Sequence, residues 1–168
     1  DSATSVAAVL AGGIGGVVRL TSGDAGTGVA ADAITINGHL AWQASNGGLA
    51  LQTRIKVDRI TNAYIFVGFT DVATGVEAPV TLSGTTFTTN ATDAAGFMFD
   101  TTATTDTWRL VGVANNVDAT EQDLGVAPVA DDYETLRVEF NVDGDALFFR
   151  NGAQVGTILS DAVTPTVD

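Results

Sequence analysis

Residues 133–159 read YETLRVEFNVDGDALFFRNGAQVGTIL, and this stretch decides the fold class. Its first part alternates apolar and polar side chains with a period of two, which a strand with one core face and one solvent face requires. The expected core-facing positions are Leu136, Val138, Phe140 and Val142, and the expected solvent-facing positions are Thr135, Arg137 and Glu139. Asp143-Gly144 and Asn151-Gly152 are turn pairs that tolerate positive φ. The stretch therefore predicts a three-stranded antiparallel meander.

The same period continues upstream. Residues 49–58 alternate in the same way, which predicts another half-buried strand. Residues 62–70 are apolar on both faces, which favours a central strand covered on both sides. Further strands are expected at 80–82, 96–100 and 108–113, with weaker signals at 16–21, 33–36 and 40–43. Short strands separated by turn signals, with no helical pattern, predict an all-β antiparallel fold, either a β-sandwich or a barrel.

Composition agrees with this fold class and sets the domain organisation. The chain has 168 residues, which suits one ordinary domain. Asp, Gly, Thr and Val are abundant, and they favour turns and strands over helices. We expect residues 1–15 to form a Gly/Ala-rich N-terminal arm that docks onto a neighbour, and residues 16–168 to form a single sandwich domain.

Charge and residue counts exclude several functions. Twenty acidic residues against seven basic ones give a formal net charge of -13, which disfavours binding to nucleic acid or to anionic lipid. No apolar stretch is long enough for membrane insertion. The chain has no cysteine and only one histidine, His39, so sites that need thiolates or two histidines are excluded.

The C-terminal half resembles a known family. The segments are residues 133–140, the Asp143-Gly144 turn, residues 146–149 and the Asn151-Gly152 turn, and residues 65–71 and 96–100 also fit. This order resembles the concanavalin A-like lectin/glucanase jelly roll of the laminin-G-like kind, in versions carried by tailed-phage structural proteins. The resemblance covers roughly residues 16–159. It implies a jelly-roll sandwich, but the fold hosts enzymes, lectins and structural modules alike.

No catalytic constellation is recognised. Glucanases of this fold carry E-x-D-x-E or E-x-D-x-x-E on one strand, and neither pattern occurs here. Glu134 and Glu139 are separated by an odd number of residues, so a strand places them on opposite faces. Asp143 and Asp145 bracket a turn, where Asp is expected for backbone reasons. The sequence therefore predicts a protein that is not an enzyme.

Calcium and sugar sites remain open at this stage. The candidate calcium ligands are loop carboxylates, and the alternative is that these acidic loops are simply solvated. They are Asp71, Asp100, Asp131 and Asp132, with Asp118 and Asp123 as further members of the set. Trp42 and Tyr64 are the candidate sugar-binding aromatics, and the alternative is that both pack in the core. No other cofactor is expected.

The sequence thus leads to two functional hypotheses. The first is a structural module of a virus particle: a capsid decoration, head-fibre or tail-fibre protein of a tailed virus, located in the virion or outside the cell. Its expected partners are capsid or fibre subunits and further copies of itself in a homo-oligomer. The second is a carbohydrate-binding, lectin-like module of a secreted or virion protein, with a host-surface glycan as the ligand.

Overall fold

The computed structural model describes residues 6–10, 17–21, 34, 36, 42–46, 48–72, 77–118, 121–158 and 162–165. The chain divides into two compact units. The smaller unit comprises Asp1–His39 and Ala73–Ala78, and the larger one comprises Leu40–Val72 and Pro79–Asp168. The described regular structure is strand throughout, apart from one short 3₁₀ turn, η1 (Ala44–Asn46). The prediction of an all-β chain is confirmed.

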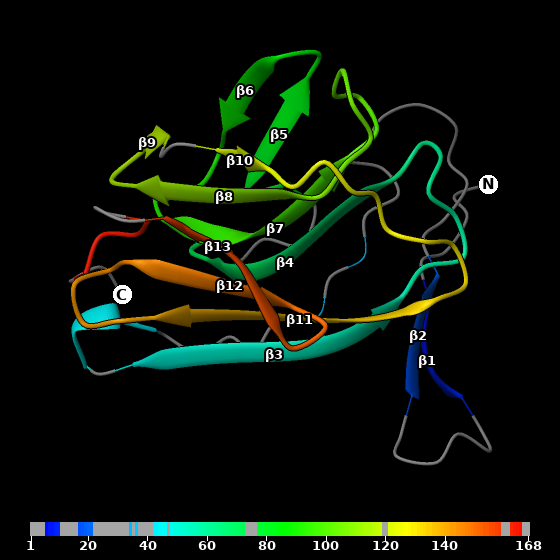
Figure 1. Ribbon diagram of the computed structural model, residues 1–168, viewed down its shortest axis with the longest axis horizontal. Helices are drawn as coiled ribbons and strands as arrows, with labels where there is room; N and C mark the ends of the chain where they lie inside the picture. The colour runs from blue at the N-terminus through cyan, green and yellow to red at the C-terminus, as the bar shows by residue number, and fades with distance from the viewer. Residues whose placement is uncertain are drawn as a thin grey trace. The chain divides into compact units, whose positions relative to one another are not determined.

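Two antiparallel sheets make up most of the larger unit (Figure 1). The five-stranded sheet has the order β10 (Gln122–Asp123), β8 (Arg109–Ala114), β7 (Ala94–Asp100), β4 (Tyr64–Thr70), with β9 (Val117–Asp118) also paired to β8. The four-stranded sheet has the order β13 (Ala153–Ile158), β12 (Ala146–Arg150), β11 (Tyr133–Phe140), β3 (Leu49–Lys56). A hairpin of β5 (Val80–Ser83) and β6 (Thr86–Thr89) completes the described strands of this unit.

The main core lies between these two sheets. Phe97 of β7 lies edge-on to Trp108 and to Phe148 of β12, with ring centroids 6.1 Å and 5.5 Å apart. Leu136 and Val138 of β11 are fully buried in the same cluster. Side chains from the two sheets thus fill one apolar layer, so the larger unit is a β-sandwich.

A second core covers the other face of the five-stranded sheet. Val80 and Leu82 of β5 pack with Met98 of β7 and with Val111 of β8. All seven residues of β7 are buried as a result. The β5–β6 hairpin therefore covers the outer face of one sheet (Figure 1). On the four-stranded sheet, the outward-facing residues of β3 are exposed.

Several sequence-based expectations are confirmed and two are wrong. β3 and β11 show the predicted alternation, and Asn151 and Gly152 form a two-residue turn with φ of 52° and 84°. Val142 was expected to face the core but is 52% exposed, because β11 ends at Phe140 and a five-residue loop follows. The strand at 62–70 was expected to be central. It is covered on both faces, yet β4 ends the described order of its sheet.

The regions before residue 49 are described only in part. The signal at 16–21 is confirmed as β2 (Val17–Thr21), which pairs antiparallel with β1 (Val6–Leu10). The expected strands at 33–36 and 40–43 lie largely outside the described residues, and the described Trp42 and Gln43 are not in a strand. We call β1 and β2 together the N-terminal ribbon. β1 lies within residues 1–15, where an arm was expected, whereas β2 lies in the stretch that was assigned to the sandwich domain.

The N-terminal ribbon exposes large apolar side chains. Val9 and Val18 are direct cross-strand partners and are 73% and 49% exposed. Leu20 on the same strand as Val18 is also exposed. A two-stranded ribbon is at best marginally stable in water, because it has too little apolar surface to bury.

The backbones of β4 and β7 approach each other closely at a pair of glycines, and a substitution there can test the described pairing. Gly68 and Gly96 are cross-strand partners, and a Cβ on Gly68 would lie 2.2 Å from the Ala95 carbonyl oxygen. We expect Gly68→Ala to lower the free energy of unfolding by about 1–3 kcal/mol through overpacking. Urea denaturation followed by tryptophan fluorescence measures this. Gly48→Ala is the control, because its Cβ would meet no atom closer than 3.4 Å; equal losses in both variants would contradict the described pairing.

Candidate functional site

The outer face of the four-stranded sheet carries a polar and aromatic grid. Alternation along β11 buries Leu136 and Val138, so the residues between them point outward. Register then sets the neighbours: Arg137 of β11 pairs with Gln52 of β3 on one side and with Phe149 of β12 on the other. Two residues earlier on β11, Thr135 pairs with Arg54. The core packing of one face thus fixes the arrangement on the other.

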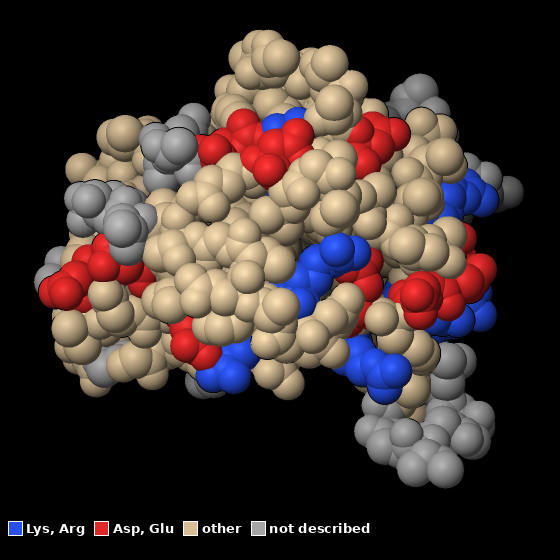
Figure 2. Space-filling model, in the orientation of Figure 1, with Lys and Arg blue, Asp and Glu red and all other residues tan. Residues whose placement is uncertain are grey.

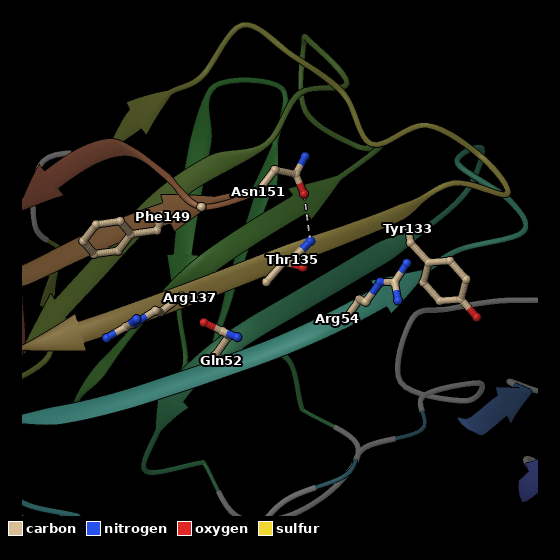
Figure 3. Close-up of a pocket in the computed structure, with 8 residues that line it drawn as sticks. Gln52, Arg54, Tyr133, Thr135, Arg137, Phe149 and Asn151 are labelled. Carbon is tan, nitrogen blue, oxygen red and sulfur yellow. Dashed lines mark hydrogen bonds between the residues drawn. The ribbon is translucent and has the colours of Figure 1, made fainter. Parts of the chain in front are cut away.

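A pocket of about 640 Å³ opens on this face (Figure 3). Strands β3, β11 and β12 and the turn after β12 supply its lining residues. These are Gln52, Arg54, Tyr133, Thr135, Arg137, Phe149, Asn151 and Gly152. We refer to this set as the sheet pocket.

Two arginine–aromatic contacts organise the sheet pocket. The guanidinium carbon of Arg54 lies 4.3 Å from the Tyr133 ring centroid, and that of Arg137 lies 5.7 Å from the Phe149 ring centroid. Such cation–π contacts are worth about 0.5–1 kcal/mol at exposed sites. At the edge of the pocket, the Thr135 backbone N–H donates to Asn151 Oδ1 at 2.9 Å, as Figure 3 shows. The aromatic rings and the turn therefore restrain the polar groups.

The sheet face concentrates positive charge on an acidic protein. Arg54, Lys56 and Arg137 all point outward here, and they are three of the seven basic residues of the chain. The matching acidic groups are Glu139, which forms an ion pair with Arg137, and Asp131, whose Oδ1 lies 3.4 Å from Lys56 Nζ. On the face drawn in Figure 2, charged groups form separate clusters and most of the surface is uncharged.

A buried carboxylate lies on the opposite side of β11. Glu134 is 5% exposed and points inward, where its Oε2 lies 2.5 Å from Arg150 Nε. Its Oε1 accepts a hydrogen bond from Trp108 Nε1 at 3.4 Å. A buried charge requires such partners. The pair also joins the end of β12, next to the Asn151-Gly152 turn, to the core.

A second ion-pair network surrounds Arg109 on β8. Its guanidinium pairs with Glu121, lies 3.2 Å from Asp123 Oδ2 and donates to Thr105 Oγ1 at 2.7 Å. Partial burial raises the pKa of Asp123, but hydrogen bonds from Thr107 and the Gly125 N–H, together with Arg109, outweigh it. The net effect holds the pKa of Asp123 below its ordinary value. This network fastens β10 and the 104–107 turn to β8.

The four leading calcium candidates form hydrogen bonds or ion pairs with other groups of the protein. Asp100 accepts hydrogen bonds from the backbone of Leu82 and from Thr102, and it is nearly fully buried. Asp71 accepts from the Thr92 N–H, while Asp132 accepts from the Tyr133 N–H. Asp131 forms the ion pair with Lys56 given above. Within the described ranges, no three His, Cys, Asp or Glu side chains form a group that could hold a metal ion.

The two candidate sugar-binding aromatics are engaged in packing. Trp42 stacks on Phe140 with centroids 5.7 Å apart, and its Nε1 donates to the Thr70 carbonyl at 3.4 Å. Tyr64 packs in the second core and donates its hydroxyl to the Val80 carbonyl at 2.6 Å. Burial raises the pKa of Tyr64, and the hydrogen bond to Val80 only partly offsets this effect. His39 lies outside the described residues.

Sequence reasoning missed the sheet pocket. Its arginines were read as solvent-facing strand positions, and Phe149 was read only as part of a returning strand. The alternation contained the signal that Arg54 and Arg137 point outward. It could not show that they line the same pocket, because that depends on which strand pairs with which and in what register.

Comparisons with family models, with curated proteins and with solved structures found no match to this chain. Among the described residues there is no helix of the length and apolarity that a membrane crossing demands.

The Arg109 network yields a pH prediction. Because the folded-state pKa of Asp123 is lowered, its contribution to stability is complete above the ordinary Asp pKa of about 3.9 and is lost as pH falls through the folded value. We expect Asp123→Asn to reduce the free energy of unfolding at pH 7 by less than about 1 kcal/mol, since solvent screens this partly exposed group. Urea unfolding at pH 7 and pH 3 should show this difference shrinking at low pH. The control is Asp106→Asn, at an exposed position of the neighbouring turn, which should change stability little at either pH. A stability loss from Asp123→Asn that is larger at pH 3 than at pH 7 would contradict the lowered pKa of Asp123.

Proposed function

We propose that the protein is a non-enzymatic structural module of a virus particle, with a concanavalin A-like jelly-roll sandwich as its body. Under this proposal it is a capsid decoration, head-fibre or tail-fibre protein of a tailed virus. The resemblance of residues 133–152 to such proteins supports this function, as do the β-sandwich and the acidic surface. The expected partners are capsid or fibre subunits and other copies of the chain.

The N-terminal ribbon is the observation that carries the assembly part of this proposal. Val9 and Val18 face each other across the two strands and are both exposed, so the ribbon leaves apolar surface unburied. Burial of such surface gains about 25 cal/mol per Å². We assign a second copy of this chain as the partner that covers it, because closed homo-oligomers are the most common protein assemblies.

A second candidate function is carbohydrate binding, and the sheet pocket favours it. The pocket combines Tyr133 and Phe149 with neutral hydrogen-bonding groups on Gln52 and Asn151. Ligand sites for small molecules commonly combine aromatic walls with a few such polar groups. Under this proposal the particle would carry a lectin-like surface directed at a host glycan.

Ribbon-mediated assembly predicts a concentration-dependent oligomer. We expect the protein to self-associate in size-exclusion chromatography with light scattering, and Val9→Ser combined with Val18→Ser to give a monomer at the same concentration. The control is Val129→Ser, at an exposed valine of the sandwich unit, which should leave the oligomer intact. A monomeric wild-type protein, or assembly unaffected by the ribbon substitutions, would count against this assignment.

The location in a virus particle has a direct test. Peptides of the chain should be recovered by mass spectrometry from density-purified particles of the virus that encodes it, in fixed ratio to the capsid protein. Treatment of the particles with protease before lysis should remove the chain if it decorates the surface. Its recovery from infected cells but not from particles would refute the proposal.

A further inference from the structure

Residues 162–165, which we call the strap, pack against the main core of the larger unit. We propose that the strap closes one end of this core and opens as a unit, without unfolding of the sandwich. The buried carboxyl group of Asp93 sets the strength of the closure. The inference goes beyond the proposed function and depends on neither the sheet pocket nor the N-terminal ribbon.

Hydrogen bonds anchor the strap to three separate parts of the larger unit. The strap belongs to no strand, so no ladder of hydrogen bonds fixes it. Among the described residues, one bond joins it to the 141–145 loop, one to the residue before β7 and one to η1. A segment held by so few bonds can open locally. The bonds are Val163 N–H to the Gly144 carbonyl at 3.3 Å, Thr164 N–H to Asp93 Oδ1 at 2.5 Å, and Ser45 N–H to the Pro165 carbonyl at 2.9 Å.

The strap fits closely over the core. Ala162 and Val163 are fully buried in the main core cluster. Gly144 has a φ of 83°, and a Cβ at this position would lie 2.4 Å from the Val163 carbonyl oxygen. Glycine at this position therefore allows the 141–145 loop to approach the strap, which excludes water from the apolar side chains below.

The strap and an aromatic cluster share one end of the core. Trp42, Phe69 and Phe140 contact one another with ring centroids 5.0, 5.3 and 5.7 Å apart, and they belong to or pack against the same core cluster as the strap. Two anchors of the strap follow these rings along the chain, since Ser45 lies three residues after Trp42 and Gly144 lies four residues after Phe140. Opening of the strap therefore exposes apolar surface at the end of the core where these rings lie.

The Asp93 anchor is incompletely satisfied. Asp93 is fully buried, and its Oδ2 has no hydrogen-bond partner among the described residues. The buried Thr164 Oγ1 also has no partner there. No basic side chain of the described ranges lies within ion-pair distance of Asp93. Buried polar atoms without partners cost free energy, so they weaken the closed state of the strap.

A second buried carboxylate on the same side of the sequence shows that this is specific to the strap. Asp100, at the end of β7, is 5% exposed and has partners for both oxygens. Its Oδ2 accepts from the Leu82 N–H at 3.1 Å, and its Oδ1 accepts from the N–H and the hydroxyl of Thr102 at 2.9 Å and 2.7 Å. The fold thus satisfies one buried carboxylate of this region fully and leaves the one beneath the strap short of donors.

Amide hydrogen exchange of the full chain, followed by NMR, tests whether the strap opens as a unit. The amides of Ser45, Val163 and Thr164 each donate one of the three anchoring bonds, so we expect them to share one protection factor. That factor should be at least about tenfold lower than those of Leu136 and Val138, whose strand is paired on both sides. Equal protection of strap and core amides, or three unrelated values for the anchoring amides, would overturn the proposal.

Substitution of Asp93 tests the anchor. Asp93→Asn keeps an oxygen acceptor for the Thr164 N–H and adds an N–H donor for Thr164 Oγ1, so we expect protection of the strap amides to rise about tenfold. Asp93→Ala leaves the Thr164 N–H without an acceptor and should lower their protection at least about tenfold. The matched control is Asp100→Asn, which removes an acceptor that the strap does not use and should change their protection less than twofold.

The same variants test what the strap covers. Asp93→Ala should bind more of the apolar dye ANS than the wild-type protein, and Asp93→Asn should bind less, because the dye reports exposed apolar surface. Lower protection of the strap in Asp93→Asn, or no response of the strap to either substitution, would overturn the role assigned to Asp93. Faster exchange in Asp93→Ala with unchanged dye binding would overturn the exposure of the core. Thermal unfolding checks that each variant is folded.

Discussion

The burial of one apolar layer between two sheets is the constraint on which the rest of the larger unit depends. Phe97 and Trp108 from one sheet pack against Leu136 and Phe148 from the other. Because side chains alternate along a strand, fixing Leu136 inward forces its neighbours on β11 outward. A slip of one residue would place the whole apolar set in water, so the register is strongly determined. The outer face of the four-stranded sheet is therefore as precisely arranged as the core behind it.

The sandwich differs in two ways from a single apolar core between two sheets. Glu134 occupies an inward position on β11 and is satisfied by Arg150 and by Trp108 Nε1. Removing one partner would leave a buried charge, so the three groups act together at the end of the sheet. The β5–β6 hairpin is the second departure, because it gives the five-stranded sheet a second core and leaves the two sheet faces unequal. One outer face is closed by packing, and the other presents polar and aromatic groups.

The sequence was sufficient for the strands and turns that rely on local rules. The period of two predicted β3 and β11, and the Asn151-Gly152 pair predicted its turn, because both depend on neighbouring residues alone. The errors arose where distant residues decide. Val142 fits the alternation but follows the end of β11. β4 is apolar on both faces because a core covers each face, although it ends the described order of its sheet. Trp42 and Tyr64 were reasonable sugar-binding candidates by residue type, yet packing partners far along the chain engage both. The sheet pocket could not be predicted without the strand register, which brings residues of β3, β11 and β12 to one face.

The two proposed uses of the molecule support each other physically. A single open pocket with two guanidinium groups and two aromatic walls is expected to hold one sugar residue only weakly, since it offers few contacts. An assembly built through the N-terminal ribbon would present several such pockets at once. When one pocket is occupied, the next binding event on the same glycan surface becomes effectively intramolecular, which raises the overall affinity about 10²–10⁴-fold without any new contact. Loss of assembly would then weaken attachment to a glycan-coated surface while leaving the affinity for a free disaccharide unchanged.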